Sequence, residues 1–82
     1  MKELFFTSRA EKDLRKIDTK SKSSIINKLQ QFRRDGTSVI PLTGTWKGWH
    51  KLRVGNYRIL LTIQKRTWIV GFIRHRKDAY KN

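Results

Sequence analysis

The chain has 82 residues, no cysteine and a formal net charge of +14, because 20 lysines and arginines face only six acidic residues. This length leaves room for one domain, residues 1–82, with a small core. The absence of cysteine excludes disulfides and thiolate metal sites, and the apolar runs are too short for a signal peptide or a membrane span, so we expect a cytoplasmic protein. The charge predicts a polyanionic partner, either nucleic acid or an acidic protein.

The N-terminal residues predict a short strand followed by a first helix. The strand covers residues 2–6. Ser8 and Glu11 fit a capping box, in which Ser8 caps the helix and Glu11 reaches back to the amide of the cap. Apolar residues then recur at i, i+4 and i+7 from Ala10 to Ile17, which places them in one stripe on a helix of about three turns.

A second helix follows, capped by either Asp18 or Thr19 and closed by Gly36. Its apolar residues have helical spacing and are Ile25, Ile26, Leu29 and Phe32. Beyond this helix, residues 37–47 lose the helical period around Pro41. We therefore expect a loop or an irregular entry into the next strand.

The stretch from Trp49 to Ile63 predicts a hairpin, because Gly55-Asn56 separates two alternating runs and both residues tolerate a positive φ. The turn sets a register that pairs Val54 with Tyr57, Arg53 with Arg58, Leu52 with Ile59 and Lys51 with Leu60. Alternation assigns one face to the core, with Leu52, Val54, Tyr57, Ile59, Leu61 and Ile63. The opposite face receives Lys51, Arg53, Arg58, Leu60 and Thr62.

The last long strand spans Trp68 to Ile73 and follows a loop at Lys65-Arg66. With this loop, the residues that point to the core are Trp68, Val70 and Phe72. The residues expected on the face of Arg53 and Arg58 are Ile69, Gly71, Ile73 and His75. Gly71 in mid-strand indicates either a bulge or a close approach to the backbone.

The predicted order is β-α-α-β-β-β, an α+β fold with two N-terminal helices packed on a mainly antiparallel four-stranded sheet. The other face of the sheet, or a groove in it, stays open. Lys51, Arg53 and Arg58 cluster on this face, and directly opposed arginines repel each other. We interpret the cluster as an anion site, because forked guanidinium groups match phosphate oxygens.

RNA offers a reaction that such a face can assist without a metal or other cofactor, because its 2′-hydroxyl can attack the adjacent phosphate. The protein supplies a proton acceptor, cations for the phosphorane and an acid for the leaving 5′-oxygen. His75 is the only side chain near this face that titrates close to neutral pH, whereas His50 falls on the core face and is expected to be structural. Trp46 and Trp49 either stack on bases or cover the edge of the core. Metal-dependent hydrolysis is disfavoured, since Asp78 is the only carboxylate after residue 35.

The sequence resembles the RelE/ParE superfamily of bacterial toxin–antitoxin toxins over nearly its whole length. The segments that carry the resemblance are the first-helix run Ala10 to Lys16, the hairpin Lys51 to Ile59 and the terminal run His75 to Tyr80. The resemblance implies a compact toxin that a cognate acidic antitoxin binds and neutralises. RelE-like members cleave mRNA on the translating ribosome without a metal, which inhibits translation and growth.

The resemblance also implies site residues. The catalytic set is Lys51, Arg53, Arg58, His75, Arg76 and Tyr80. The expected RNA contacts are Lys47, Trp49, Arg74 and Lys77. Cations would neutralise the phosphate and the leaving group, and Tyr80 would stack on or orient a base. Some ribonuclease members use a glutamate as general base, and no glutamate follows Glu11 here, so the base is either His75 or Lys51.

Two other functions stay open at this point. ParE-like members share the fold and much of the hairpin but poison DNA gyrase. A non-catalytic nucleic-acid-binding module is the third alternative, and it would bind with strong salt dependence. The presence of His75, Arg76 and Tyr80 together with the arginine pair favours the ribonuclease.

Overall fold

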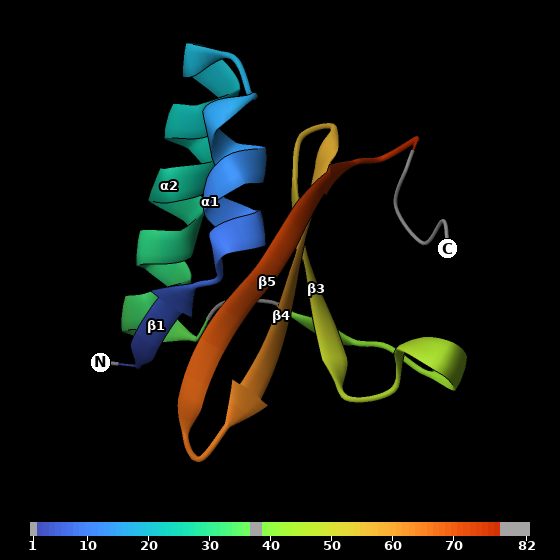
Figure 1. The fold of residues 1–82 in the computed structure, drawn as a ribbon. Coiled ribbons are helices and arrows are strands. Elements are labelled where there is room, and N and C mark those ends of the chain that lie inside the picture. Colours follow the sequence, from blue (N-terminus) through green and yellow to red (C-terminus); the bar gives the residue numbers. More distant parts are fainter. Residues whose placement is uncertain (1, 37–38, 78–82) are drawn as a thin grey trace.

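The computed structural model describes residues 2–36 and 39–77, which form two helices on one side of a five-stranded sheet (Figure 1). The elements are β1 (Glu3–Phe6), α1 (Ser8–Arg15), α2 (Thr19–Asp35), β2 (Ile40–Pro41), the 3₁₀ turn η1 (Gly44–Trp46), β3 (Trp49–Val54), β4 (Tyr57–Gln64) and β5 (Thr67–His75). The strand order is β1-β5-β4-β3-β2, with β1 parallel to β5 and the other neighbours antiparallel. The α+β class is confirmed. The sheet has five strands instead of four, because the two residues of β2 pair with β3.

The N-cap residue of α1 lies one position earlier than the sequence predicts. Thr7, not Ser8, is the cap, and its Oγ1 accepts a hydrogen bond from the Ala10 amide at 3.0 Å. The helix is also shorter than three turns and ends at Arg15, although Ile17 beyond it is still buried in the core. Thr7 fits the cap position because it directly follows β1 in extended backbone, and its hydroxyl has a second partner in the sheet, described below.

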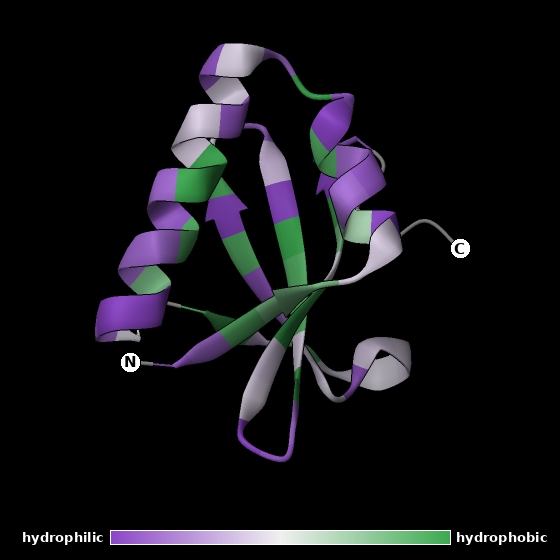
Figure 2. Cartoon of the chain, turned by 60° about the vertical axis from the view of Figure 1, so that its left-hand side comes forward, coloured by the Kyte–Doolittle hydropathy of each residue, from purple (hydrophilic) through white to green (hydrophobic). Residues whose placement is uncertain are grey.

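The second helix begins and ends as predicted. The Asp18 carboxylate accepts a hydrogen bond from the Ser21 amide at 2.9 Å. Hydrogen bonds from Ser21 hold the pKa of the Asp18 carboxyl below its ordinary value. Gly36 closes the helix with φ at +63°, a left-handed conformation that favours glycine. The apolar side of α2 faces the sheet (Figure 2) and buries Ile25, Leu29 and Phe32.

The β3–β4 hairpin has the predicted register. Arg53 pairs with Arg58 across the hairpin and Leu52 pairs with Ile59, with Gly55 in the turn at φ +57°. The side of the hairpin under the helices holds Leu52, Ile59 and Leu61 in the main core. We call this side of the sheet the covered face and the opposite side the open face.

A β-bulge at Gly71 changes which side chains of β5 reach each face. Leu61 pairs with Val70, but Leu60 pairs with Phe72, so Gly71 is an extra residue opposite this step. The predicted alternation is therefore correct before Gly71 and wrong after it. Phe72, which was expected in the core, lies on the open face, whereas Ile73 and His75, expected on the open face, lie on the covered face.

Two side chains of the N-terminal segment stabilise the bulge. Past Val70, β5 no longer pairs with β1, so part of its backbone needs other hydrogen-bond partners. The Thr7 hydroxyl donates to the Gly71 carbonyl at 2.6 Å, and the Asp13 carboxylate accepts from the Ile73 amide at 3.0 Å. One helix cap and one helix side chain thus hold the bulge against α1.

Two further residues differ from the alternating pattern. Leu60 points to the open face as predicted but is only 1% exposed, so the open face has an apolar area of its own. Ile63 was expected in the core but is 45% exposed. The β4–β5 hairpin extends past the ends of both helices (Figure 1), and Ile63 is the second-last residue of β4, next to the turn of this hairpin.

Candidate functional site

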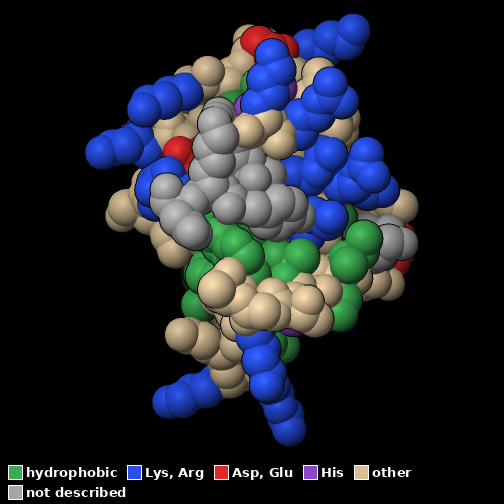
Figure 3. All heavy atoms as spheres, turned by 90° about the vertical axis from the view of Figure 1, so that its right-hand side faces the viewer, with side chains coloured by type: hydrophobic (Ala, Val, Ile, Leu, Met, Phe, Trp, Pro, Cys, Tyr) green, Lys and Arg blue, Asp and Glu red, His purple; other side chains and the backbone are tan. Residues whose placement is uncertain are grey.

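Three arginines lie side by side across the open face. Arg53 on β3 pairs with Arg58 on β4, and Arg58 pairs with Arg74 on β5. Neighbouring strands are about 4.8 Å apart, so the three cationic side chains start close together. Lys51 shares the same face of β3. We call these four residues the cationic cluster, and Figure 3 shows lysine and arginine side chains gathered on this side of the molecule.

The local backbone orients the central arginine. Nη1 of Arg58 donates to the Gly55 carbonyl at 3.2 Å and to the Tyr57 carbonyl at 3.0 Å, so the guanidinium lies at the β3–β4 turn. Residues 36–77 contain no aspartate or glutamate. Closely spaced guanidinium groups of this kind have the charge and the shape that suit a phosphate group.

Three aromatic side chains lie beside the cationic cluster. The ring centroid of Phe72 is 5.7 Å from that of Trp46 and 5.3 Å from that of Trp49. The guanidinium carbon of Arg74 lies 4.9 Å from the Phe72 centroid, a cation–π distance that joins the two groups. We call Trp46, Trp49 and Phe72 the aromatic ledge. The two tryptophans therefore pack on the open face and not at the edge of the main core.

The absence of a side chain at Gly71 makes room for the ledge. A Cβ at this position would lie 2.5 Å from two carbons of the Trp49 ring. Both predicted roles of Gly71, the bulge and the close approach, are confirmed. The Thr62 hydroxyl also donates to the Gly48 carbonyl at 2.9 Å, which holds the segment before Trp49 against β4.

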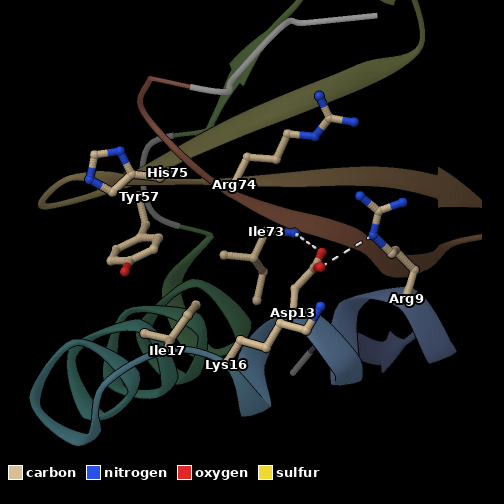
Figure 4. A pocket seen from close by; sticks show the side chains of 8 residues that line it. All are labelled: Arg9, Asp13, Lys16, Ile17, Tyr57, Ile73, Arg74 and His75. Carbon is tan, nitrogen blue, oxygen red and sulfur yellow. Dashed lines mark hydrogen bonds and ion pairs between the residues drawn. The ribbon is translucent and has the colours of Figure 1, made fainter.

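His75 lies apart from Arg53 and Arg58, on the covered face. Its ring packs edge-on against Tyr57 with centroids 5.4 Å apart, and its Nδ1 accepts a hydrogen bond from the Lys77 amide at 3.3 Å. His75 lines a groove of about 430 Å³ between α1 and β5 (Figure 4), with Arg9, Asp13, Lys16, Ile17, Tyr57, Ile73 and Arg74. Arg74 thus contributes both to this groove and to the cationic cluster. The expectation that His75 shares a face with the arginine pair is wrong.

The other predicted residues lie around these two surfaces. Arg76 and Lys77 are exposed in the turn after β5, where the Arg76 amide donates to the Asn56 carbonyl at 2.7 Å. Lys47 is exposed after η1. Tyr80 lies outside the described residues. In the described ranges, no three histidine, aspartate or glutamate side chains form a group suited to a metal.

His50 is on the covered face, opposite Leu61, as predicted, and its ring packs edge-on against Trp68 at 4.9 Å. The sequence pattern missed Phe72 as a member of a surface next to the arginines, and it left open whether Trp46 stacks on bases or covers the edge of the core. Strict alternation assigns Phe72 to the core, and only the glycine at position 71 indicates that the alternation breaks there.

The fold and the site define a small, strongly basic α+β protein with a cluster of cationic side chains on one face of its sheet. A family model described as the ParE toxin of the type II toxin–antitoxin system parDE matches residues 4–80. The chain belongs to this family, within the RelE/ParE superfamily, and is a type II toxin–antitoxin toxin. No protein with a curated description matches the sequence. No helix in residues 2–36 or 39–77 has the length and apolar character needed to cross a membrane.

Solved structures share the fold of this chain. The RelBE2 toxin–antitoxin complex from Mycobacterium tuberculosis matches with a TM-score of 0.81 and 25% identity, over 94% of this chain and 93% of that chain. The RelB–RelE complex from Methanococcus jannaschii has a TM-score of 0.75 and 22% identity, over 93% and 94%. The DinJ–YafQ complex from E. coli has a TM-score of 0.73 and 12% identity, over 98% of both chains.

Proposed function

We propose that this toxin is a metal-independent endoribonuclease that cleaves mRNA on the translating ribosome and so inhibits translation and growth. The observation that carries the proposal is the cationic cluster, in which three paired arginines and Lys51 share the open face. Forked guanidinium groups stabilise the extra negative charge of a phosphorane more than that of the ground-state phosphate.

The reaction needs few groups beyond these cations. The 2′-oxygen forms a bond to phosphorus and the bond to the 5′-oxygen breaks, which leaves a 2′,3′-cyclic phosphate and a 5′-hydroxyl. The 2′-hydroxyl proton goes to a general base, and the 5′-oxygen receives a proton from an acid. Arg53, Arg58 and Arg74 hold the phosphate between these two steps.

Lys51 is the better placed of the two candidate bases. Lys51 lies on the open face with the arginines. His75 lies on the covered face, and its Nδ1 accepts a hydrogen bond from the Lys77 amide. With Nδ1 accepting, a neutral His75 carries its proton on Nε2 and acts as a donor. We therefore assign the base to Lys51 and a donor role at the groove to His75.

The proposed partners are mRNA, the ribosome and an antitoxin. The solved structures similar to this chain include toxin–antitoxin complexes. A net charge of +14 favours an acidic antitoxin, since complementary charge speeds encounter and disfavours wrong partners. We propose that a cognate acidic protein covers part of this surface.

Ribosomes stalled on a defined mRNA test the ribonuclease directly. The purified toxin is added to these ribosomes and to the same mRNA alone, and the new 5′ ends are mapped by primer extension. We expect cuts in the A-site codon on ribosomes only. Arg58→Ala should lower the cutting rate by about 100-fold, the usual effect of removing one charge-stabilising donor, and Lys51→Ala should also lower it.

A second function, inhibition of DNA gyrase, is favoured by two observations. The matching family model is that of ParE toxins. In addition, His75 lies on the covered face, so the open face with the arginine pair holds no histidine. A folded toxin that arrests growth but cuts no ribosomal mRNA would support this alternative. The accompanying assay is the accumulation of gyrase-cleaved DNA.

A further inference from the structure

We propose that the aromatic ledge is a base-stacking platform for single-stranded RNA, and that it selects an unpaired nucleotide next to the phosphate held by the cationic cluster. The inference rests on the proposed function, whose substrate it defines more closely. It assigns a binding role to Phe72, which the sequence pattern placed in the core, and it chooses the stacking role for Trp46, for which the sequence left two roles open.

The position of the three rings supports this role. Phe72 lies on the open face only because of the bulge at Gly71, and Trp49 approaches the bare backbone there. None of the three rings belongs to the main core under the helices. Each ring is partly exposed. Partly exposed aromatic faces on a side without a covering helix are suited to flat apolar groups from a ligand.

The neighbouring charges define the class of that ligand. Phe72 pairs with Leu60, and two residues along β5 is Arg74, which pairs with Arg58. A distance of two residues along a strand is roughly 6.6 Å, so the rings and the arginines lie within the dimensions of one nucleotide. A ligand that fits both carries a flat aromatic face and a negative charge. A nucleotide has both in one unit.

The ledge also discriminates between single and double strands. In a duplex the bases stack on each other and expose only their edges, so they cannot cover an aromatic ring of the protein. In a single strand the base can leave the stack and lie on an aromatic side chain while its phosphate contacts arginine. We therefore expect preference for unpaired RNA, the form of mRNA in which a codon is read.

Equilibrium binding of the full chain tests the ledge without ribosomes. The probes are an unstructured RNA of about 12 nucleotides, the same RNA annealed to its complement, and a single-stranded DNA of the same sequence. Fluorescence of the tryptophans reports stacking, because Trp46 and Trp49 lie on the ledge, whereas Trp68 packs against Phe32 under the helices. We expect quenching by both single strands and weaker binding of the duplex.

Variants separate stacking from phosphate contacts. Trp46→Leu and Phe72→Leu should each weaken single-strand binding by about tenfold and leave the salt dependence unchanged. Arg58→Ala should lower the slope of log affinity against log salt by about 0.7, the value for one phosphate contact in a single strand. Ile63→Ala is the control, since Ile63 is exposed and pairs with Trp68 on the side of the sheet opposite to the ledge, and it should bind like the parent.

The results distinguish this proposal from the proposed function. Duplex binding as tight as single-strand binding, or parental affinity in both folded ledge variants, would overturn the ledge. Ledge variants that lose binding support it even if the parent cuts no ribosomal mRNA, a result that would remove the ribonuclease alone. Circular dichroism of each variant verifies that the fold is intact. If Trp46→Leu does not fold, Phe72→Leu decides the question.

Discussion

The two faces of the sheet use the same strands for opposite purposes. The covered face of β3 and β4 carries Leu52, Ile59 and Leu61, which pack under both helices and stabilise the fold. The open face of the same strands carries like charges in adjacent positions, such as Arg53 and Arg58, which oppose folding. The difference teaches that the covered face of these strands carries the main core, whereas the like charges of the open face do not stabilise the fold and are, in our proposal, kept for function.

The largest expected effect comes from truncating the covered face. Ile59 is fully buried, so Ile59→Ala removes apolar contacts and leaves a cavity, at a cost of about 2–5 kcal/mol in the free energy of unfolding. Arg53→Ala, one residue pair away on the open face, should change this free energy little or increase it slightly. Urea unfolding measures both. If the two variants lose similar stability, the contrast between the faces is wrong.

A smaller effect is expected at Gly71, where the two faces exchange residues. Gly71→Ala places a Cβ 2.5 Å from the Trp49 ring, and such overpacking costs about 1–3 kcal/mol. Replacing the ring by Trp49→Leu should remove most of this cost. A thermal-unfolding cycle with the parent, both single variants and the double variant measures the coupling. Equal costs of Gly71→Ala in both backgrounds would contradict the close approach of the ring to the bulge.

The smallest expected effect is a pH dependence on the helical side, away from the open face. The pKa of the Asp18 carboxyl is lowered in the folded chain below its ordinary value of 3.8. The ionised cap therefore stabilises the protein above that value, and this contribution is lost as the pH falls through the lower, folded pKa. Asp18→Asn keeps a capping oxygen but does not titrate. The difference in melting temperature between parent and variant should be constant above about pH 5 and shrink in stronger acid; a difference that grows in acid would have the wrong sign.

The sequence predicts the parts of this structure that local rules control. The Gly55-Asn56 turn sets the hairpin register, and Asp18 and Gly36 delimit α2, because caps and turns depend on residues close in sequence. Alternation from the turn assigns Lys51, Arg53 and Arg58 of the cationic cluster to the open face, whereas Arg74 is predicted only from the family resemblance.

The remaining features depend on distant parts of the chain. Thr7 and Asp13, from the segment before β2, bind the backbone at the bulge and just after it, and local patterns near Gly71 do not reveal these partners. The bulge then reverses the faces of Phe72, Ile73 and His75. One extra residue therefore explains both why alternation assigns the histidine to the wrong face and why it leaves Phe72 out of the aromatic ledge.

Growth arrest by a pair of matched arginine variants tests the central claim, that the open face is the functional surface. Arg58→Ala removes the central cation of the open face, and Arg34→Ala removes an exposed arginine of α2 on the helical side. Both variants should fold. We predict that cells expressing Arg58→Ala grow normally, while Arg34→Ala arrests growth like the parent toxin. Arrest by folded Arg58→Ala at the parental level would contradict the assignment of the site.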